Sequence, residues 1–293
     1  MSGAAPRSER PPGDRAGAGA SAALVPERSV HAASLVAFVG LLRRDLRVLT
    51  RERGRFLLRT VSQPLLLVFV FTYVFPRIGQ DLRGFGGAAS FTDILVPGVL
   101  AIAVLIKGIQ VVALPLVEEF GYTNEIEDRV MAPLPVWGVA VEKIVAAALQ
   151  GLLAALIVLP IALWVPAETP QLAVVWPHLV AVALCSALLA GALGLALGTS
   201  VEPNQVPIMF SVVILPITFL GATYFPWAQL DAIPWLQWAV LANPLVYMAE
   251  GFRMALTPQF PHMSPWGIYA GLVGLTLVFG ALGVRGFHRR VIG

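Results

Sequence analysis

The sequence predicts an all-α integral membrane protein with six transmembrane helices, an N-terminal interfacial helix, and an extracellular helical re-entrant hairpin between spans five and six. Hydrophobic residues make up 57% of the chain and charged residues only 13%, whereas charged residues are about 25% of an average soluble domain. From Phe56 onward, six long apolar stretches follow one another, and nearly all charged residues lie in the gaps between them. A soluble globular protein is therefore excluded.

The N-terminal residues differ in composition from the rest of the chain. They are rich in Ala, Gly, Pro and Arg, and they lack the continuous apolar core of a signal peptide. We therefore expect residues 1–33 to be a disordered cytoplasmic tail without a signal peptide. We expect residues 34–293 to form a single transmembrane domain, because short loops between six spans leave no room for a second module.

Residues 35–55 predict a helix that lies in the membrane interface. Apolar residues recur at helical spacing on one face, and arginines occupy the opposite face. The apolar face holds Leu35, Phe38, Val39, Leu42, Leu46 and Leu49, and the basic face holds Arg43, Arg44, Arg47 and Arg51. The basic face would contact anionic lipid headgroups. A second interpretation is that this helix holds a cytoplasmic partner.

Six segments are long and apolar enough to cross the bilayer, because a spanning helix needs about 20 residues for a hydrocarbon core of about 30 Å. The predicted spans are Phe56 to Phe75, Ile94 to Val117, Val136 to Val165, Val174 to Thr199, Ile208 to Phe225, and Trp266 to Val284. Basic residues cluster before the first span and after the last, and such residues stay in the cytoplasm. Arg is also strongly preferred over Lys, which is typical of a GC-rich bacterial source. We therefore expect a multi-pass protein of the bacterial plasma membrane with both termini in the cytoplasm.

The segment between the fifth and sixth spans lies outside by this topology, yet it is too apolar for a solvated loop. Asn243 followed by Pro244 predicts a helix start, since Asn can accept an orphan backbone N–H and Pro loses no hydrogen bond there. The helix should run to about Leu256 with one apolar face, while Glu250 and Arg253 lie on the other face and can form an ion pair. Lipid-exposed irregular backbone is costly, so we predict a helical re-entrant hairpin.

A seventh span over about Trp235 to Phe252 is the alternative for this segment. Its uninterrupted apolar part is short, and the Asn-Pro pair breaks it. It would also place the C-terminal arginines outside, against the charge rule. The hairpin is therefore the favoured interpretation.

Two patterns inside the spans predict packing rather than chemistry. The fourth span carries small residues that permit close helix contact, namely Gly191, Ala192, Gly194, Ala196 and Gly198. Tryptophans near the outer ends of the spans predict an aromatic belt, namely Trp164, Trp176, Trp227, Trp235, Trp238 and Trp266.

The loop between the second and third spans, residues 118–135, is the densest acidic patch of the chain. Its charged residues are Glu118, Glu119, Glu125, Glu127, Asp128 and a lone Arg129. Acidic side chains gain nothing from anionic lipid, so solvation or a protein partner must explain them. The loop is either a solvated connector or a short helix around residues 124–131 that docks on a cytoplasmic protein.

Three charged residues inside the spans are candidates for the translocation pathway. Lys107 lies near the middle of the second span, where a lysine costs about 2.5 to 3.5 kcal/mol, so it should face a cavity or a partner. It either marks the pathway and attracts an anionic headgroup, or it is satisfied by a carbonyl or hydroxyl within the bundle. Glu142 and Lys143 begin about two turns into the third helix. Lys143 can extend to the cytoplasmic headgroups. Glu142 can either cap a pore entrance or take the proton of a neighbour.

Four segments resemble the permease subunits of type-2 ABC transporters of the drug or polysaccharide exporter type. Residues 124–135, NEIEDRVMAPLP, precede a long span and look like the coupling loop of that family. Residues 219–226 and 241–253 look like its fifth-span end and its extracellular hairpin, and residues 96–98, VPG, open the second span in the same way. The resemblance covers about residues 35–290.

The resemblance implies a transmembrane permease subunit that pairs with a second copy or a related permease, above two copies of a separate ABC ATPase. ATP and Mg would be used by that ATPase, and this chain would bind no cofactor. The implied ATPase-coupling loop comprises Glu118, Glu119, Glu125, Ile126, Glu127, Asp128 and Arg129. The implied extracellular gate hairpin comprises Phe225, Pro226, Asn243, Pro244, Tyr247, Glu250 and Arg253. The implied cargo is a lipophilic drug or antibiotic, or a glycan or lipid-linked substrate, and export also follows from the resemblance.

The sequence itself argues that any ATPase is a separate chain. A phosphate-binding loop ends in Gly-Lys-Ser/Thr, but the two lysines, Lys107 and Lys143, follow Ile and Glu. Neither paired aspartates nor a serine and histidine facing each other in the core are present, so we expect no enzyme, no metal site and no nucleic-acid partner. The alternative is a self-contained ion-coupled secondary transporter that uses Lys107 and Glu142, although the internal repeat usual in such carriers is missing.

Overall fold

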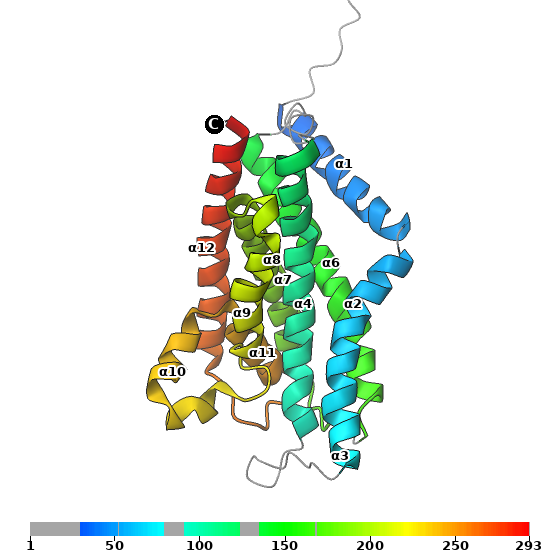
Figure 1. Ribbon diagram of the computed structural model, residues 1–293, viewed down its shortest axis with the longest axis vertical. Helices are drawn as coiled ribbons and strands as arrows, with labels where there is room; N and C mark the ends of the chain where they lie inside the picture. The colour runs from blue at the N-terminus through cyan, green and yellow to red at the C-terminus, as the bar shows by residue number, and fades with distance from the viewer. Residues whose placement is uncertain (1–29, 52, 79–90, 124–134, 168, 293) are drawn as a thin grey trace, which may run out of the picture.

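The computed structural model describes residues 30–51, 53–78, 91–123, 135–167 and 169–292. Within these residues the chain is helical and contains no strand, so the predicted all-α class is confirmed. The long helices run side by side in one elongated bundle, and the C-terminus lies at the same end as α1 (Figure 1).

Eleven α-helices and six short turns of 3₁₀ or π geometry make up the described part of the chain. The α-helices are α1 Val30–Arg51, α2 Arg53–Val68, α3 Phe75–Arg77, α4 Phe91–Glu118, α6 Val136–Trp164, α7 Trp176–Ser200, α8 Val206–Met209, α9 Leu215–Phe219, α10 Pro234–Ala239, α11 Pro244–Leu256 and α12 Pro265–Ile292. The short turns are η1 Phe69–Val74, η2 Glu119–Thr123, η3 Pro203–Gln205, η4 Phe210–Ile214, η5 Trp227–Ala232 and η6 Val240–Ala242.

Among the described residues, five helical segments are long and apolar enough to cross a membrane. They are Phe56–Arg77, Phe91–Gly121, Val136–Trp164, Trp176–Ser200 and Pro265–Val291. These segments coincide with the first, second, third, fourth and sixth predicted spans, which are thereby confirmed as apolar helices of spanning length. The predicted helix before the first span is also present as α1, which contacts α6, and its Arg43, Arg44 and Arg47 are exposed.

The fifth predicted span is shorter than the sequence suggested. The apolar helix there is Pro203–Phe219, about 26 Å long at 1.5 Å per residue, and it does not continue to Phe225. It ends because the chain turns: Ala222 has a left-handed φ of 54°, and a side chain on Gly221 would collide with Leu245 of α11. The turn brings the chain back against the bundle.

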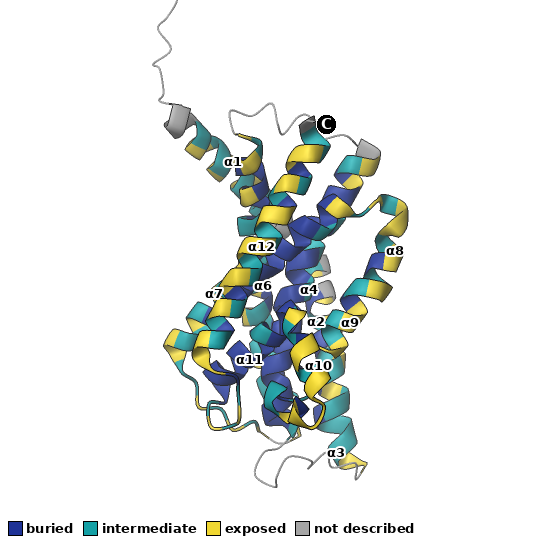
Figure 2. Ribbon diagram, turned by 90° about the vertical axis from the view of Figure 1, so that its left-hand side faces the viewer, coloured by how far each residue is buried: buried dark blue, intermediate teal, exposed yellow. Residues whose placement is uncertain are grey.

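The helix α4 forms the core of the bundle. Most of its residues are buried, and it packs against α2, α6, α7 and α11 (Figure 2). Small residues allow the close approach of α7 to its neighbours, as predicted. A side chain on Gly191 would lie 2.8 Å from the carbonyl oxygen of Ile144 in α6, and one on Gly198 would lie 2.8 Å from the Cα of Ala113 in α4.

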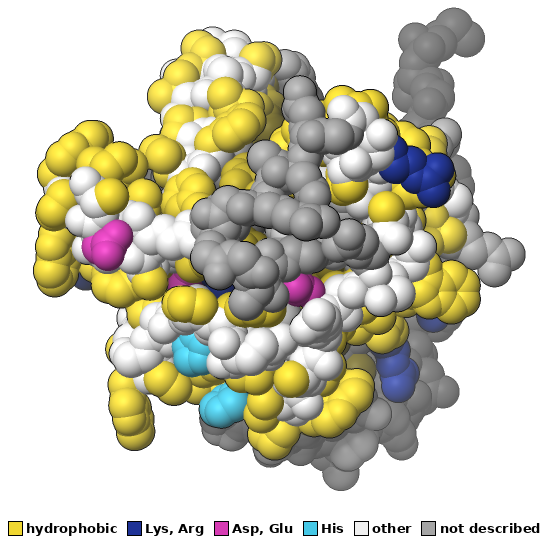
Figure 3. Space-filling model, turned by 90° about the horizontal axis from the view of Figure 1, so that it is seen from below, with side chains coloured by type: hydrophobic (Ala, Val, Ile, Leu, Met, Phe, Trp, Pro, Cys, Tyr) yellow, Lys and Arg dark blue, Asp and Glu magenta, His cyan; other side chains and the backbone are white. Residues whose placement is uncertain are grey.

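Aromatic residues gather at the end of the bundle opposite to α1. Trp164 ends α6, Trp176 begins α7, and Trp266 lies at the start of α12, and all three are exposed. Seen from this end, the described surface carries mostly hydrophobic and uncharged side chains with few charged ones (Figure 3). This distribution agrees with the predicted aromatic belt.

Candidate functional site

The candidate residues of the acidic loop fall into two groups. Glu118 and Glu119 are described, at the junction of α4 and η2. Glu118 is exposed and Glu119 is buried. The others, Glu125, Ile126, Glu127, Asp128 and Arg129, lie outside the described residues, so their predicted helix and docking role stay a prediction.

Glu119 forms a buried ion pair with Lys143 across the loop. The Lys143 Nζ lies 3.2 Å from Glu119 Oε2 and 3.4 Å from Oε1, and both side chains are less than a tenth exposed. The interpretation that Lys143 extends to lipid headgroups is therefore wrong: the carboxylate of Glu119 holds the lysine inside the bundle, where an isolated charge would be costly. The contact joins the end of α4 to the first turns of α6, on either side of residues 124–134.

Glu142 is buried as well, with 1% of its surface exposed. It precedes Lys143 on α6, so the two side chains point about 100° apart and lie on different sides of the helix. Buried carboxylates at this end of the bundle therefore come from both α4 and α6. The role of Glu142 in the translocation pathway stays a prediction.

Lys107 lies at the contact between α4 and α2. Its Nζ sits 3.8 Å from the centre of the Phe56 ring, a cation–π geometry, and the side chain is 8% exposed. It lines a small pocket whose other residues are Thr60, Gln63 and Pro64 of α2 and Ile102, Ala103, Ile106 and Gln110 of α4. The role of Lys107 in the translocation pathway stays a prediction.

The hairpin helix begins and ends where the sequence predicted. α11 runs from Pro244 to Leu256, and the Asn243 Oδ1 accepts a hydrogen bond from the Leu245 N–H at 2.9 Å. The Asn243 amide also donates to the Ile217 carbonyl at 2.9 Å, which ties the helix start to α9. The break before Pro244 separates α10 from α11, so no continuous helix forms a seventh span.

The predicted ion pair between Glu250 and Arg253 is present, and the face of α11 that carries it is buried rather than exposed. Both side chains are completely buried. The helix packs against α4, α7 and α12 at once, which removes every face of it from the surface. Burial lowers the pKa of Arg253 from its ordinary value, while the charge and hydrogen bond of Glu250 oppose that shift.

The ion pair of α11 is the centre of a hydrogen-bond network. Glu250 accepts the Trp227 N–H at 2.8 Å on Oε1 and the Met263 N–H at 2.7 Å on Oε2. Arg253 donates from Nη2 to the carbonyl oxygen of Ala222 at 2.9 Å. The same Nη2 donates to the carbonyl oxygen of Ile94 at 3.5 Å. These partners contribute through their backbones, so no side-chain pattern in the sequence could have identified them.

The remaining gate candidates surround this network. The Tyr247 hydroxyl donates to the Leu241 carbonyl at 2.9 Å, and burial raises the pKa of the Tyr247 hydroxyl. The Tyr247 ring packs on Gly271 of α12, where a side chain would collide with it. Pro226 is buried at the start of η5, and Phe225 is half-buried beside it.

Sequence reasoning missed one further residue at this end. Asp93, in the first turn of α4, is 1% exposed, and its Oδ1 accepts the Gln171 N–H at 2.7 Å. This bond joins α4 to the connection between α6 and α7. An acidic residue at the edge of an apolar stretch was the available signal, because such a group needs a donor when it is buried.

Comparison with known protein families identifies one match. The family model described as ABC-2 type transporter matches residues 36–257, which is more than half of the chain. A comparison with curated proteins gave no match.

Proposed function

This chain belongs to the ABC-2 type transporter family, and from that membership we propose that it is the permease subunit of an ATP-driven exporter. The family match over residues 36–257 carries the proposal, and the five apolar helices of spanning length agree with a multi-pass membrane protein. In this role the chain forms the translocation pathway and a separate ATPase supplies the energy. The cargo is a lipophilic drug or antibiotic, or a glycan or lipid-linked substrate.

The proposed topology has six crossings with both termini in the cytoplasm of a bacterium. The helix of residues 203–219 would be the fifth crossing, and its modest length is within the range that a bilayer accommodates by local thinning. An even number of crossings agrees with the position of α1 and the C-terminal end of α12 at one end of the bundle (Figure 1). The segment from η5 through α11 would be the re-entrant hairpin at the outer face.

The proposed contact with the ATPase is the acidic loop, residues 118–135. The described residues before and after the central part of the loop belong to η2 and α6, and the Glu119–Lys143 pair joins these two helices. A push on the loop would therefore reach α4, the buried centre of the bundle, directly. Two copies of the ATPase would act on two copies of this chain, or on this chain and a related permease.

The proposed gate is the outer hairpin. Its Glu250–Arg253 network touches the first turn of α4 through Ile94 and the turn after α9 through Ala222. A movement of α4 would therefore displace residues that the hairpin network contacts. This connection supports a hairpin that closes the outer end of the pathway and responds to the inner loop.

The test of the proposed function uses the triple variant Glu125→Ala, Glu127→Ala and Asp128→Ala, produced together with a phosphate-loop ATPase that co-purifies with the wild-type chain. We expect the variant to fold and insert normally but to lose ATP-driven transport and co-purification with the ATPase. Replacement of exposed Arg289 at the end of α12 by Ala is the control. Transport at the wild-type rate in the triple variant would remove the docking role. Uphill accumulation by liposomes that contain this chain alone would remove the ATPase requirement.

A further inference from the structure

We propose that the π turn η2 passes a displacement of the acidic loop to the fifth crossing through the contact of Gly121 with Pro203, and that residues 203–219 carry it to the outer hairpin. The inference rests on the proposed function, because it names residues that connect the inner loop of the exporter to its outer gate. It adds a second route beside α4, and it makes Gly121 and Pro203 positioning residues.

Consecutive residues of η2 contact three different parts of the chain. Glu119 forms its ion pair with α6 at 3.2 Å. The Phe120 ring packs edge to face on Phe287 of α12, with 5.9 Å between the ring centres. Gly121 lies against the Pro203 ring of η3, and a side chain on the glycine would collide with that ring. A displacement that enters η2 is therefore divided among α6, α12 and the start of the fifth crossing.

Both η2 and the fifth crossing depart from regular α-helix. η2 is a π turn, and a second π turn, η4, separates α8 from α9. Prolines also lie in the first turns of α8 and α9, at Pro207 and Pro216. π turns are frequent at functional sites, and sharp helix bends occur at prolines and π turns. The proposed route therefore runs through backbone that bends more readily than an uninterrupted α-helix.

Residues 203–219 are fastened at both ends and exposed along one face. At the inner end the fastening is Gly121, and at the outer end the Asn243 amide donates to the Ile217 carbonyl at 2.9 Å. The exposed face consists of Ile208, Val212, Leu215 and Phe219, each more than half exposed. A helix with one open face is held by less packing than the buried α4, so a shift imposed at one end is passed on to the other.

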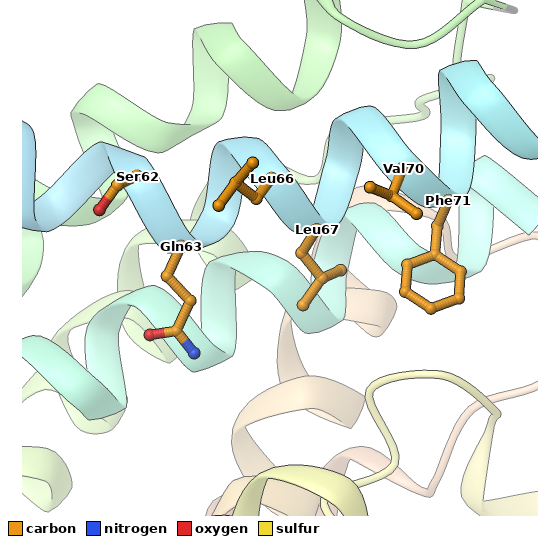
Figure 4. A pocket seen from close by; sticks show the side chains of 6 residues that line it. All are labelled: Ser62, Gln63, Leu66, Leu67, Val70 and Phe71. Carbon is orange, nitrogen blue, oxygen red and sulfur yellow. The ribbon is translucent and has the colours of Figure 1, made fainter.

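Aromatic rings extend the outer fastening to the first crossing. Tyr224 follows the turn after α9, and its ring stacks on Phe219 with 6.1 Å between the ring centres. The same ring lies 5.8 Å from that of Phe71 in η1. The Phe71 side chain points to the same side of its helix as Gln63 and Leu67 (Figure 4). A shift of the fifth crossing therefore reaches the first crossing and the hairpin together.

The experiment measures amide hydrogen exchange in the complex of the full chain with the ATPase that co-purifies with it, in phosphatidylcholine nanodiscs, without nucleotide and with ATP and vanadate. In wild type we expect the nucleotide to change the exchange rates of residues 206–219 and 244–256. Gly121→Ala forces η2 away from Pro203. The nucleotide-dependent change should then shrink about 2- to 30-fold, because substitutions along a coupling route alter the coupling free energy by about 0.5 to 2 kcal/mol.

The double variant Gly121→Ala with Pro203→Ala tests the contact itself. Loss of the proline ring makes room for the added methyl group, so the double variant should recover most of the nucleotide-dependent change. Gly274→Ala in α12 is the matched control, because nothing lies within 4 Å of the added carbon. A wild-type response in Gly121→Ala, no recovery in the double variant, or an equal loss in Gly274→Ala would each overturn the proposal.

Two outcomes keep this proposal distinct from the proposed function. A nucleotide response confined to η2 and α4 would overturn the route through residues 203–219 and leave the exporter intact. A wild-type chain that co-purifies with no ATPase would overturn the exporter. The contact is then still measured in the chain alone, where Gly121→Ala should speed exchange at residues 204–209. Unchanged exchange there would overturn the contact as well.

Discussion

The two ends of the bundle each hold a buried ion pair, and the pairs differ in how firmly their surroundings hold them. At the hairpin end, Glu250 and Arg253 belong to one helix and share four backbone groups from three other parts of the chain. At the loop end, Glu119 and Lys143 come from different helices, with contacts of 3.2 and 3.4 Å. Charge-assisted bonds are usually about 2.7 to 2.9 Å long, so the second pair is loose.

This difference shows how one bundle can combine a fixed part and an adjustable part. The hairpin pair fixes the positions of chain segments far apart in sequence, because each backbone bond to it also restrains its own segment. The loop pair restrains two helices through long, flexible side chains, so a small shift of α4 against α6 costs less there. An element that receives motion from a partner is expected to be of the second kind.

The largest expected effect comes from breaking the hairpin pair. Arg253→Met leaves Glu250 buried without its counter-charge and should lower the free energy of unfolding by about 3 to 5 kcal/mol. Thermal unfolding in detergent, followed by size-exclusion chromatography, measures this. The double variant Glu250→Gln with Arg253→Met is the control, and it should lose less than the sum of the two single variants. A stability equal to wild type in Arg253→Met would contradict the account of the network.

A smaller effect on stability is expected at the loop pair. Lys143→Met should lower the free energy of unfolding by about 1 to 3 kcal/mol, because Glu119 loses a charged partner but lies near the end of the bundle. Glu119→Lys combined with Lys143→Glu restores an ion pair and should recover most of that loss. If Lys143→Met proved as damaging as Arg253→Met, the two ends would be equally rigid and the comparison would fail.

A substitution in the tightly packed middle of the bundle tests whether the helices that connect the two ends are held rigidly. Gly191→Ala places a methyl group against the Ile144 carbonyl and Ala147 and should destabilise the fold by about 1 to 3 kcal/mol. The matched control is Gly280→Ala in α12, where nothing lies within 4 Å of the added carbon. That control should be neutral or slightly stabilising in the same unfolding assay. Equal stabilities of the two variants would show that α6 and α7 are not tightly packed.

The smallest effect is expected at the start of α11. Asn243→Ala removes the helix cap and the amide bond to Ile217, and it should cost about 1 kcal/mol or slightly more. Asn243→Asp keeps the capping oxygen but cannot donate to the Ile217 carbonyl, so it separates the two contributions. The rate of amide hydrogen exchange in α11 measures the local stability of this helix in each variant. Unchanged exchange in Asn243→Ala would mean that neighbouring helices alone position α11.

The predictions that succeeded depend on neighbouring residues. The Asn243-Pro244 pair located the start of α11, because capping and the missing proline N–H act within one helical turn. The apolar runs predicted five helices of spanning length, because the hydrophobicity of a segment is also a property of consecutive residues. The end of the fifth segment was misjudged because its turn depends on Ala222 and on the contact of Gly221 with α11, which lies more than twenty residues away.

The candidate site was predicted less completely than the fold. Lys107 was recognised as a residue that needs a cavity, since its cost in an apolar helix is visible from composition alone. Its companions Thr60 and Gln63 come from another helix, and nothing in their local sequence links them to it. In the same way, the partner of Lys143 proved to be Glu119 rather than lipid, because α4 and α6 pack side by side.

The order of residues was sufficient to establish a helical membrane protein, its main apolar helices and the boundaries of α11, because hydrophobicity, capping and proline geometry act over short stretches of chain. The packing of the bundle settled which charges are buried and what they contact. Glu250 and Arg253 are satisfied mainly by backbone groups, and backbone groups are the same at every position, so only their arrangement in space selects them.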